Sequence, residues 1–381
     1  MNPILDTLKK IRSSAAAAYL VAIAGTAAFL AQSSAYLLQL PSTLDEGNYL
    51  YKGYLFATGV LKPFQDYGVW TNKMPFAFLI PGWGQAILGP GIRTGRYFAV
   101  FLGLLMLLGL WILARRLGGK WWAAGAVLVI ALNPAMVRML DQALSEGVVV
   151  CLLMWVLVFT MAERRRLWQT VAGSALAGIT FLTRENMLPV LFFILVFIWW
   201  QHGRRHALFA AGTMGVVIIG VHAVFWPNIL TLWAPRIPEK LSPFLDAFRP
   251  YIGTSGIWDP APNVMSRIFA FWDGMRYHFV PIAGTLVILL LWPRKEGWRN
   301  NFTFRSAVIL TGMMVVMTAI HMSASLGASY CTFCFPLYMT FFSPIGLLLV
   351  AAAFPGLNTR VPFWRDIPAA LLALLLSTGI G

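Results

Sequence analysis

Long runs of apolar residues, separated by short polar or basic turns, repeat along almost the whole chain. Each run is close to the roughly 20 residues that an α-helix needs to cross a bilayer. The runs are continuous and do not alternate between apolar and polar positions, which excludes a transmembrane β-barrel. An all-α, polytopic membrane protein is therefore predicted, with about 11 spans over residues 15–37, 97–114, 121–134, 143–162, 168–183, 187–201, 207–226, 279–292, 306–323, 330–354 and 368–381.

The composition supports this class, because 59% of the 381 residues are hydrophobic and only 11% are charged. Soluble domains of this length do not have such a composition. The first apolar run follows Lys9, Lys10 and Arg12 and lacks a small-residue cleavage site, so we expect a retained helix rather than a cleaved signal peptide. Cys331 and Cys334 lie in an apolar stretch, and we expect them to pack rather than to bind a metal or cycle between redox states.

The predicted topology depends on whether the short apolar run 75–89 crosses the membrane. This run is interrupted by Pro81 and Gly82 and is short for a span. If it lies in the membrane interface, one set of segments holds 17 of the 29 Lys and Arg residues but only 4 of the 14 Asp and Glu residues. By the positive-inside rule this set is cytoplasmic. The set comprises the N-terminus and the loops 115–120, 163–166, 202–206, 293–305 and 355–367. The chain is therefore predicted to lie in the inner (plasma) membrane with its N-terminus in the cytoplasm.

Two long segments then face the exterior, the loop 38–96 and the loop 227–278. They divide the chain into a membrane module over 1–226, the second loop, and C-terminal helices over 279–381. The first loop, which we expect to contain interfacial helices, gathers most of the chemistry. Its charged candidates stand among Tyr, Phe and Trp residues, which stack on sugars or lie at the headgroup level. These candidates are Asp45, Glu46, Asp66 and Lys73.

Several short motifs follow one another in a recognisable order over about residues 10–200. They are Leu44-Asp45-Glu46-Gly47-Asn48-Tyr49, Asn72-Lys73-Met74-Pro75, Gly95-Arg96-Tyr97-Phe98, Leu144-Ser145-Glu146 and the helix that ends at Arg184-Glu185-Asn186. This order resembles the GT-C superfamily of membrane glycosyltransferases that use polyprenyl-phosphate sugars. The most similar branch is the group of protein O-mannosyltransferases and aminoarabinose-lipid A transferases. Two departures stand out: Met74 replaces a family proline, and Ser329-Tyr330 stands where a phosphate-binding arginine often precedes tyrosine.

The resemblance implies a base for the acceptor hydroxyl, cations for the departing phosphate and an apolar groove for the lipid. Asp45 or Glu46 supplies the catalytic base, and because adjacent carboxylates at a helix start point in different directions, we expect Asp45 to face the sugar. Helix capping is the alternative role for Asp45. The phosphate is predicted to bind Lys73, Arg96 and Arg184. Lys73 and Arg96 have an alternative role as residues that extend to the membrane interface.

The remaining acids are assigned to the acceptor side or to a supporting network. They are Asp66, Asp141, Glu146 and Glu185. For Glu146 the alternative is a structural ion pair with Arg138. Clustered carboxylates also suit a divalent metal ion, with Asp45 as a candidate ligand, although no ligand spacing requires one.

Together these observations predict a glycosyltransferase that moves a sugar from a polyprenyl-phosphate donor to a glycan, lipid or protein acceptor on the external face. The net charge of +15 is a topology signal, so no nucleic-acid partner is expected. Two alternatives remain open. A transporter or lipid flippase would place its essential charges at mid-membrane on broken helices. A non-catalytic subunit of an envelope assembly complex, with a partner subunit, would be consistent with the missing late arginine.

Overall fold

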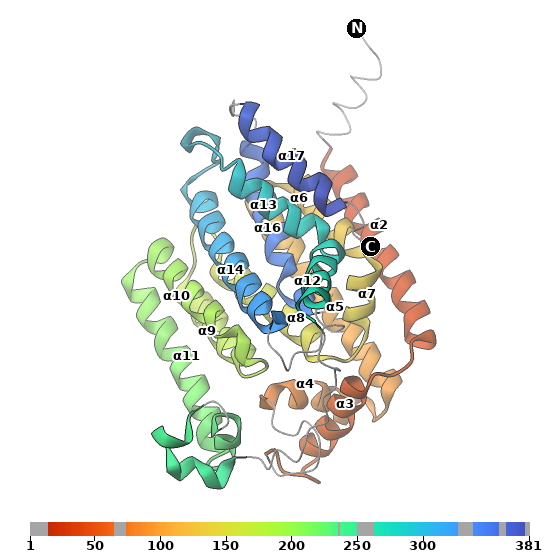
Figure 1. The fold of residues 1–381 in the computed structure, drawn as a ribbon, viewed down its shortest axis with the longest axis vertical. Helices are drawn as coiled ribbons and strands as arrows, with labels where there is room; N and C mark the ends of the chain where they lie inside the picture. Colours follow the sequence, from red (N-terminus) through yellow and green to blue (C-terminus); the bar gives the residue numbers. More distant parts are fainter. Residues whose placement is uncertain are drawn as a thin grey trace.

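The computed structural model of the chain describes residues 14–64, 74–234, 237–249, 263–326, 338–357 and 363–377. Within these residues the regular elements are helices (Figure 1). The α-helices are α2 (Ala15–Gln39), α3 (Leu44–Ala57), α4 (Pro75–Leu88), α5 (Ile92–Gly118), α6 (Lys120–Ala131), α7 (Pro134–Asp141), α8 (Ser145–Thr160), α9 (Leu167–Phe181), α10 (Leu188–His202), α11 (Arg204–Val224), α12 (Val264–Tyr277), α13 (Phe279–Leu290), α14 (Asn301–Leu326), α16 (Ser343–Ala353) and α17 (Phe363–Ser377). Short 3₁₀ helices include η1 (Glu185–Met187), η2 (Asn228–Leu232), η4 (Glu239–Leu241), η5 (Pro243–Phe248) and η7 (Met339–Phe341).

The predicted class of a polytopic α-helical membrane protein is confirmed. Five helical stretches in the described residues are long and apolar enough to cross a bilayer: Ala15–Gln39, Ile92–Gly118, Glu185–His202, Arg204–Val224 and Asn301–Ser323. The pair α6 and α7 passes the same test together but is bent by 75° at its break. Other apolar helices, such as α8, are shorter than a full span. The count of about 11 spans therefore stays a prediction.

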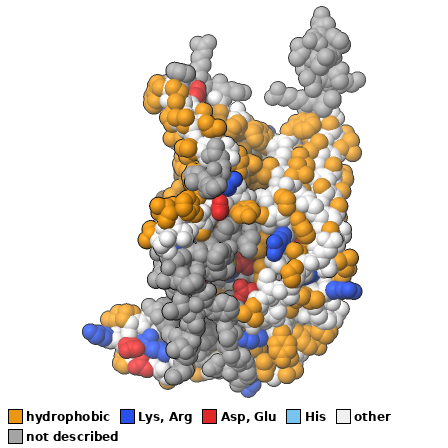
Figure 2. Space-filling model, turned by 45° about the vertical axis from the view of Figure 1, so that its right-hand side comes forward, with side chains coloured by type: hydrophobic (Ala, Val, Ile, Leu, Met, Phe, Trp, Pro, Cys, Tyr) orange, Lys and Arg blue, Asp and Glu red, His pale blue; other side chains and the backbone are white. Residues whose placement is uncertain are grey.

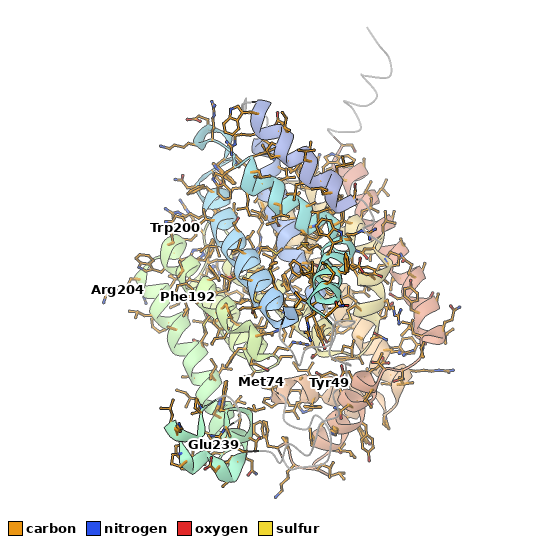
Figure 3. The ribbon with its side chains drawn as sticks, viewed as in Figure 1. Tyr49, Met74, Phe192, Trp200, Arg204 and Glu239 are labelled. Atoms are coloured by element: carbon orange, nitrogen blue, oxygen red, sulfur yellow. The ribbon has the colours of Figure 1, made fainter. Side chains whose placement is uncertain are left out.

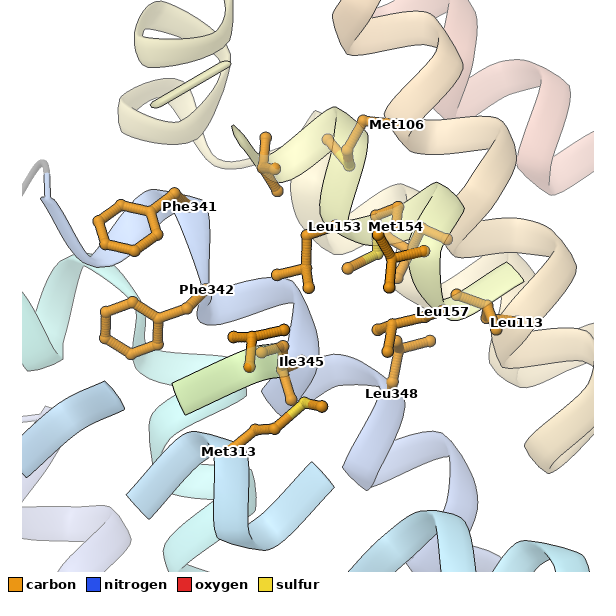
Figure 4. Packing of buried hydrophobic residues seen from close by; sticks show 14 of the residues in the cluster. Met106, Leu113, Leu153, Met154, Leu157, Met313, Phe341, Phe342, Ile345 and Leu348 are labelled. Atoms are coloured by element: carbon orange, nitrogen blue, oxygen red, sulfur yellow. The ribbon is translucent and has the colours of Figure 1, made fainter. Parts of the chain in front are cut away.

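The centre of the bundle is formed by α5, α8 and α16 (Figure 4). Helix α8 is buried on nearly every face, which explains why its sequence is apolar throughout instead of being amphipathic. Leu113 of α5, Leu157 of α8 and Leu348 of α16 are all at most 1% exposed. Removing one such side chain costs about 2–5 kcal/mol because the surrounding helices cannot close the space. This rigid core fixes the helix ends on which the polar residues lie.

The outer surface is apolar as well. Large hydrophobic side chains are exposed on helices at the edge of the bundle, with Leu20 65% and Val216 73% exposed. Figure 2 shows hydrophobic side chains over much of the described surface, with few charged ones between them. An aqueous surface with so many exposed apolar side chains would aggregate, so this one is suited to lipid.

Helices α3 and α4 lie in the lower part of the view in Figure 1, away from α17 at the top. They cross at a point where two glycines meet. A Cβ on Gly82 would lie 2.0 Å from the carbonyl oxygen of Gly53, and a Cβ on Gly53 would lie 2.4 Å from that of Phe78. Only glycine allows the two backbones to approach so closely. With 14 residues, α4 is too short to cross a bilayer, which agrees with the interfacial position predicted for residues 75–89.

The segment 227–278, predicted as an external loop, contains more regular structure in its described residues than the sequence indicated. Its first part forms η2, η4 and η5, and its last part is helix α12. Asn263 caps α12 by accepting a hydrogen bond from the Ser266 backbone N–H at 2.8 Å. The sequence analysis predicted a loop because prolines and tryptophans are dense in this segment. Asn263, a residue type that often caps helices, marks the start of α12.

Candidate active site

Arg96 of α5 and Glu46 of α3 form a bidentate ion pair inside the protein. The Arg96 Nε donates to Glu46 Oε1 at 2.9 Å and Nη2 donates to Oε2 at 2.8 Å. The same guanidinium donates to the carbonyl oxygens of Leu37, Leu40 and Pro41 at 3.3, 2.8 and 3.3 Å. All five of its N–H groups are therefore used within the protein. Glu46 is 0% exposed and Arg96 3%.

This pair fixes the turn between α2 and α3 rather than presenting a cation to a ligand. The Ala143 backbone N–H also donates to Glu46 Oε1, at 3.2 Å, so the turn before α8 is attached to the same carboxylate. The predicted phosphate role of Arg96 and the predicted catalytic role of Glu46 stay untested. The geometry instead favours a structural function for both residues.

Asp45 lies on the first turn of α3 with its side chain half-buried. Asp45 and Glu46 differ in their surroundings, since Glu46 is fully enclosed, while the expectation that Asp45 faces the sugar stays a prediction. The cap of α3 is Thr43, whose Oγ1 accepts from the Glu46 N–H at 3.2 Å, so the capping role considered for Asp45 belongs to another residue. A carboxylate in the first turn is stabilised by the unpaired backbone N–H groups and the helix dipole.

A second polar cluster joins α3, the start of α8 and the turn after α9. Glu146 is 4% exposed and forms an ion pair with Arg184. Ser145 links this pair to α3: its hydroxyl lies 2.9 Å from the Arg184 Nη1 and 3.2 Å from the Tyr49 hydroxyl. The alternative partner considered for Glu146, Arg138, is exposed at the surface of α7, so that ion pair is not formed.

Arg184 lies at the turn between α9 and η1, and hydrogen bonds of its backbone fix its position. Its N–H donates to Thr180 O at 3.1 Å, and its carbonyl accepts from the Met187 N–H at 3.1 Å. Within the described part of the chain only Nη1 of the guanidinium makes hydrogen bonds, and these go to Ser145 and Glu146. Burial lowers the pKa of Arg184, but the Glu146 carboxylate, together with Tyr49 and Tyr338, outweighs it and the pKa is raised. Arg184 thus stays a cation, and Nε and Nη2 are available to a ligand.

Aromatic residues of the late helices cover the Arg184 guanidinium. Its central carbon lies 5.5 Å from the Tyr338 ring centre and 5.2 Å from that of Phe341. The Phe341 ring is also 5.0 Å from the ring of His321, on α14. The sequence did not identify these aromatic residues or His321 as part of the site. The one feature that could have indicated His321 is its position inside an apolar run, which is a costly place for a polar side chain.

The start of α4 lies against the same turn, since the Phe76 backbone N–H donates to Leu182 O at 3.1 Å. Figure 3 shows Tyr49 and Met74 toward one end of the molecule, far from Trp200 and Arg204. Two predicted site residues, Asp66 and Lys73, lie outside the described residues. So do Ser329-Tyr330 and the Cys331–Cys334 pair.

The structure separates Asp141 from the Glu146 cluster. Its Oδ1 accepts from the Ser33 hydroxyl of α2 at 2.7 Å, and the side chain is 1% exposed. Glu185 follows Arg184 and is half-buried. No group of three His, Cys, Asp or Glu side chains suited to a metal ion occurs in the described part of the chain.

Comparison with known proteins identifies similar folds. Residues 72–230 match the family model described as dolichyl-phosphate-mannose-protein mannosyltransferase. No curated protein matches the chain. The crystal structure of ArnT from Cupriavidus metallidurans bound to undecaprenyl phosphate is similar, with a TM-score of 0.58, 18% identity, and coverage of 94% of this chain and 63% of that one. The apo structure of the same protein gives a TM-score of 0.59, 20% identity, and coverage of 95% and 64%.

This chain has the fold of ArnT. It spans less than two thirds of the length of that protein, 63% and 64% in the two structures. In this fold, the polar residues of α3, the start of α8 and the turn after α9 lie at one end of the bundle, around the Arg184–Glu146 pair.

Proposed function

We propose that this protein is a membrane glycosyltransferase that transfers a sugar from a polyprenyl-phosphate donor to an acceptor at the external face of the membrane. The observation that carries the proposal is the state of Arg184. This arginine is a half-buried cation at the end of an apolar bundle, and among the residues that the structure describes one edge of its guanidinium is paired while the other is unused. Arginine binds phosphate through two parallel N–H groups, which the Nε–Nη2 edge provides.

In this proposal Arg184 and Lys73 stabilise the negative charge that develops on the departing phosphate. Asp45 is the base that accepts the proton of the acceptor hydroxyl as the new glycosidic bond forms. The ArnT structure with undecaprenyl phosphate supports a lipid phosphate as the donor class. The proposed acceptor is a glycan, lipid or protein that carries a free hydroxyl group.

The apolar hollow between α4, α5 and the start of α8 is lined by Pro81, Phe98, Leu102 and Val148. Its volume is about 10 Å³, which is close to the space that one water molecule needs, so an isoprenoid chain would have to part these helices to bind there.

One observation favours the transporter alternative. Helices α6 and α7 form a pair bent by 75° that ends at the buried Asp141, and broken helices with buried charges are typical of transporters. Asp141 is, however, bonded to Ser33 on α2, whereas the other buried carboxylates, Glu46 and Glu146, pair with arginines. The ArnT fold and this grouping support the enzyme.

The test measures donor binding and donor use by purified protein in liposomes. Arg184→Lys keeps the charge but loses the paired N–H groups, so we expect clearly weaker use of an undecaprenyl-phosphate sugar. Arg184→Ala should abolish binding of undecaprenyl phosphate in native mass spectrometry. Arg138→Ala, at the exposed surface of α7, is the matched control and should behave as wild type. Normal lipid-phosphate binding by Arg184→Ala would refute the proposed phosphate site.

A further inference from the structure

Two arginines from different parts of the chain meet at the end of helix α8. Arg116, in the last turn of α5, donates from Nη1 to the carbonyl oxygens of Val158 at 2.7 Å and Met161 at 3.2 Å. Arg165, in the turn between α8 and α9, donates from Nη2 to the same Val158 oxygen. Two guanidinium groups therefore lie within hydrogen-bonding distance of one carbonyl oxygen.

The positive charge of these two arginines is not balanced by the residues that the structure describes. Neither guanidinium forms an ion pair there, and the nearby Glu163 is exposed and unpaired with Arg165. The C-terminal end of a helix supplies only about half an elementary negative charge. One arginine would be enough to complement it, and two like charges at such short range repel each other. The pair therefore favours an anion as a further partner.

Both guanidinium groups retain N–H groups for such a partner. Arg116 bonds through Nη1 alone, and its Nε and Nη2 are not fully enclosed by the described residues. The Nη1 of Arg165 is likewise unbonded and not fully enclosed, whereas its Nε is buried without an acceptor. Unpaired buried donors are costly, so the protein by itself satisfies this site incompletely. A phosphate group offers several acceptor oxygens and suits arginine well.

The pair lies at a depth where lipid headgroups are expected. Trp168, three residues after Arg165, is 57% exposed, and Trp199 near the end of α10 is 61% exposed. Exposed tryptophans are typical of the interface between membrane and water. The 16 residues of α8 span about 24 Å, and the proposed active site lies at the other end of this helix. Both arginines belong to segments predicted to be cytoplasmic.

We propose that Arg116 and Arg165 bind the phosphate of an anionic phospholipid at the end of α8 opposite to the proposed active site. The phosphate oxygens accept from the unbonded N–H groups of the two guanidinium groups. A lipid with a net negative charge is favoured over a zwitterionic one, because the neighbouring Arg164 and Arg166 add positive charge. This site is separate from the sugar-transfer site and does not depend on the donor assigned there.

The experiment measures lipid binding by native mass spectrometry of the full chain in detergent at physiological salt. The probes are phosphatidylglycerol, which is anionic, and phosphatidylcholine with the same acyl chains, which is zwitterionic. The wild type should prefer phosphatidylglycerol, and Arg116→Gln and Arg165→Gln should each weaken its binding by about tenfold, near the loss of one charged hydrogen bond. Arg184→Ala, at the other end of α8, should leave this binding unchanged.

Arg164→Gln is the matched control, because it removes the same charge from an exposed position in the same turn. It should weaken binding by no more than about twofold, since exposed charges are screened. Thermal melting identifies any variant that loses its fold, and Arg165→Gln decides the outcome if Arg116→Gln does not fold.

Three results would overturn the site. They are wild-type binding of phosphatidylglycerol by folded Arg165→Gln, an equal loss in Arg164→Gln, and equal binding of both lipids by the wild type. Displacement of phosphatidylglycerol by millimolar inorganic phosphate would assign the site to a soluble phosphate and overturn the lipid as its occupant.

Discussion

Arg96 and Glu46, 50 residues apart in the sequence, share two hydrogen bonds in the interior of the protein. Glu46→Gln should therefore lower the stability of the protein, because it leaves the Arg96 cation buried without its counter-charge. Breaking one side of a buried ion pair costs about 3–5 kcal/mol. The measurement is the midpoint of thermal unfolding in detergent.

The exposed pair Arg249–Asp246 is the matched control for this prediction, since Asp246 is 54% exposed. Asp246→Asn should cost at most about 1 kcal/mol, because exposed ion pairs contribute little. Equal melting temperatures for Glu46→Gln and Asp246→Asn would show that the buried pair does not hold the α2–α3 turn.

Asp45→Asn should separate chemistry from folding. Thr43 caps α3, so the substitution leaves the helix start intact, but it removes a base. We expect sugar transfer from a lipid-phosphate donor to fall by about 10²–10⁴-fold with little change in unfolding temperature. Transfer at the wild-type rate would move the catalytic assignment to another acid, with Asp66 the next to test.

Gly82→Ala should disrupt the crossing of α3 and α4. The new Cβ would lie 2.0 Å from the backbone of Gly53, which no side-chain movement relieves. We expect a loss of about 1–3 kcal/mol or more, as for other overpacked sites, together with reduced transfer. Gly212→Ala on α11 is the control, because a Cβ there meets nothing within 4 Å. If both variants melt alike, the close approach is not needed.

The predicted topology is open to thiol labelling in intact cells. In a background without Cys151, Cys331 and Cys334, cysteine at Glu163 or Lys295 should react with an impermeant reagent only after the membrane is opened. Cysteine at Thr58, beyond α3, should react in intact cells. All three positions are exposed, so access depends on the side of the membrane alone. Labelling of Glu163→Cys in intact cells would invert the topology and the proposed sites.

The sequence by itself determined the class of the protein and the order of its motifs. Continuous apolar runs specify helices in lipid because the backbone must satisfy its own hydrogen bonds there. The run 75–89 was identified as short for a span, and α4 occupies it with 14 residues. The adjacent residues Asp45 and Glu46 were predicted to point their carboxylates in different directions, because successive residues lie on different faces of a helix.

Only the tertiary structure decided which partner each charge takes. From the sequence, Arg96 and Arg184 have the same predicted role. Arg96 nevertheless uses all five N–H groups within the protein, whereas Arg184 bonds the described residues through one nitrogen. His321 and Asn186, 135 residues apart, meet only because α14 packs against α10. Ion pairs and hydrogen bonds act over a few ångströms, and packing of distant helices sets those distances, so a linear pattern cannot reveal them.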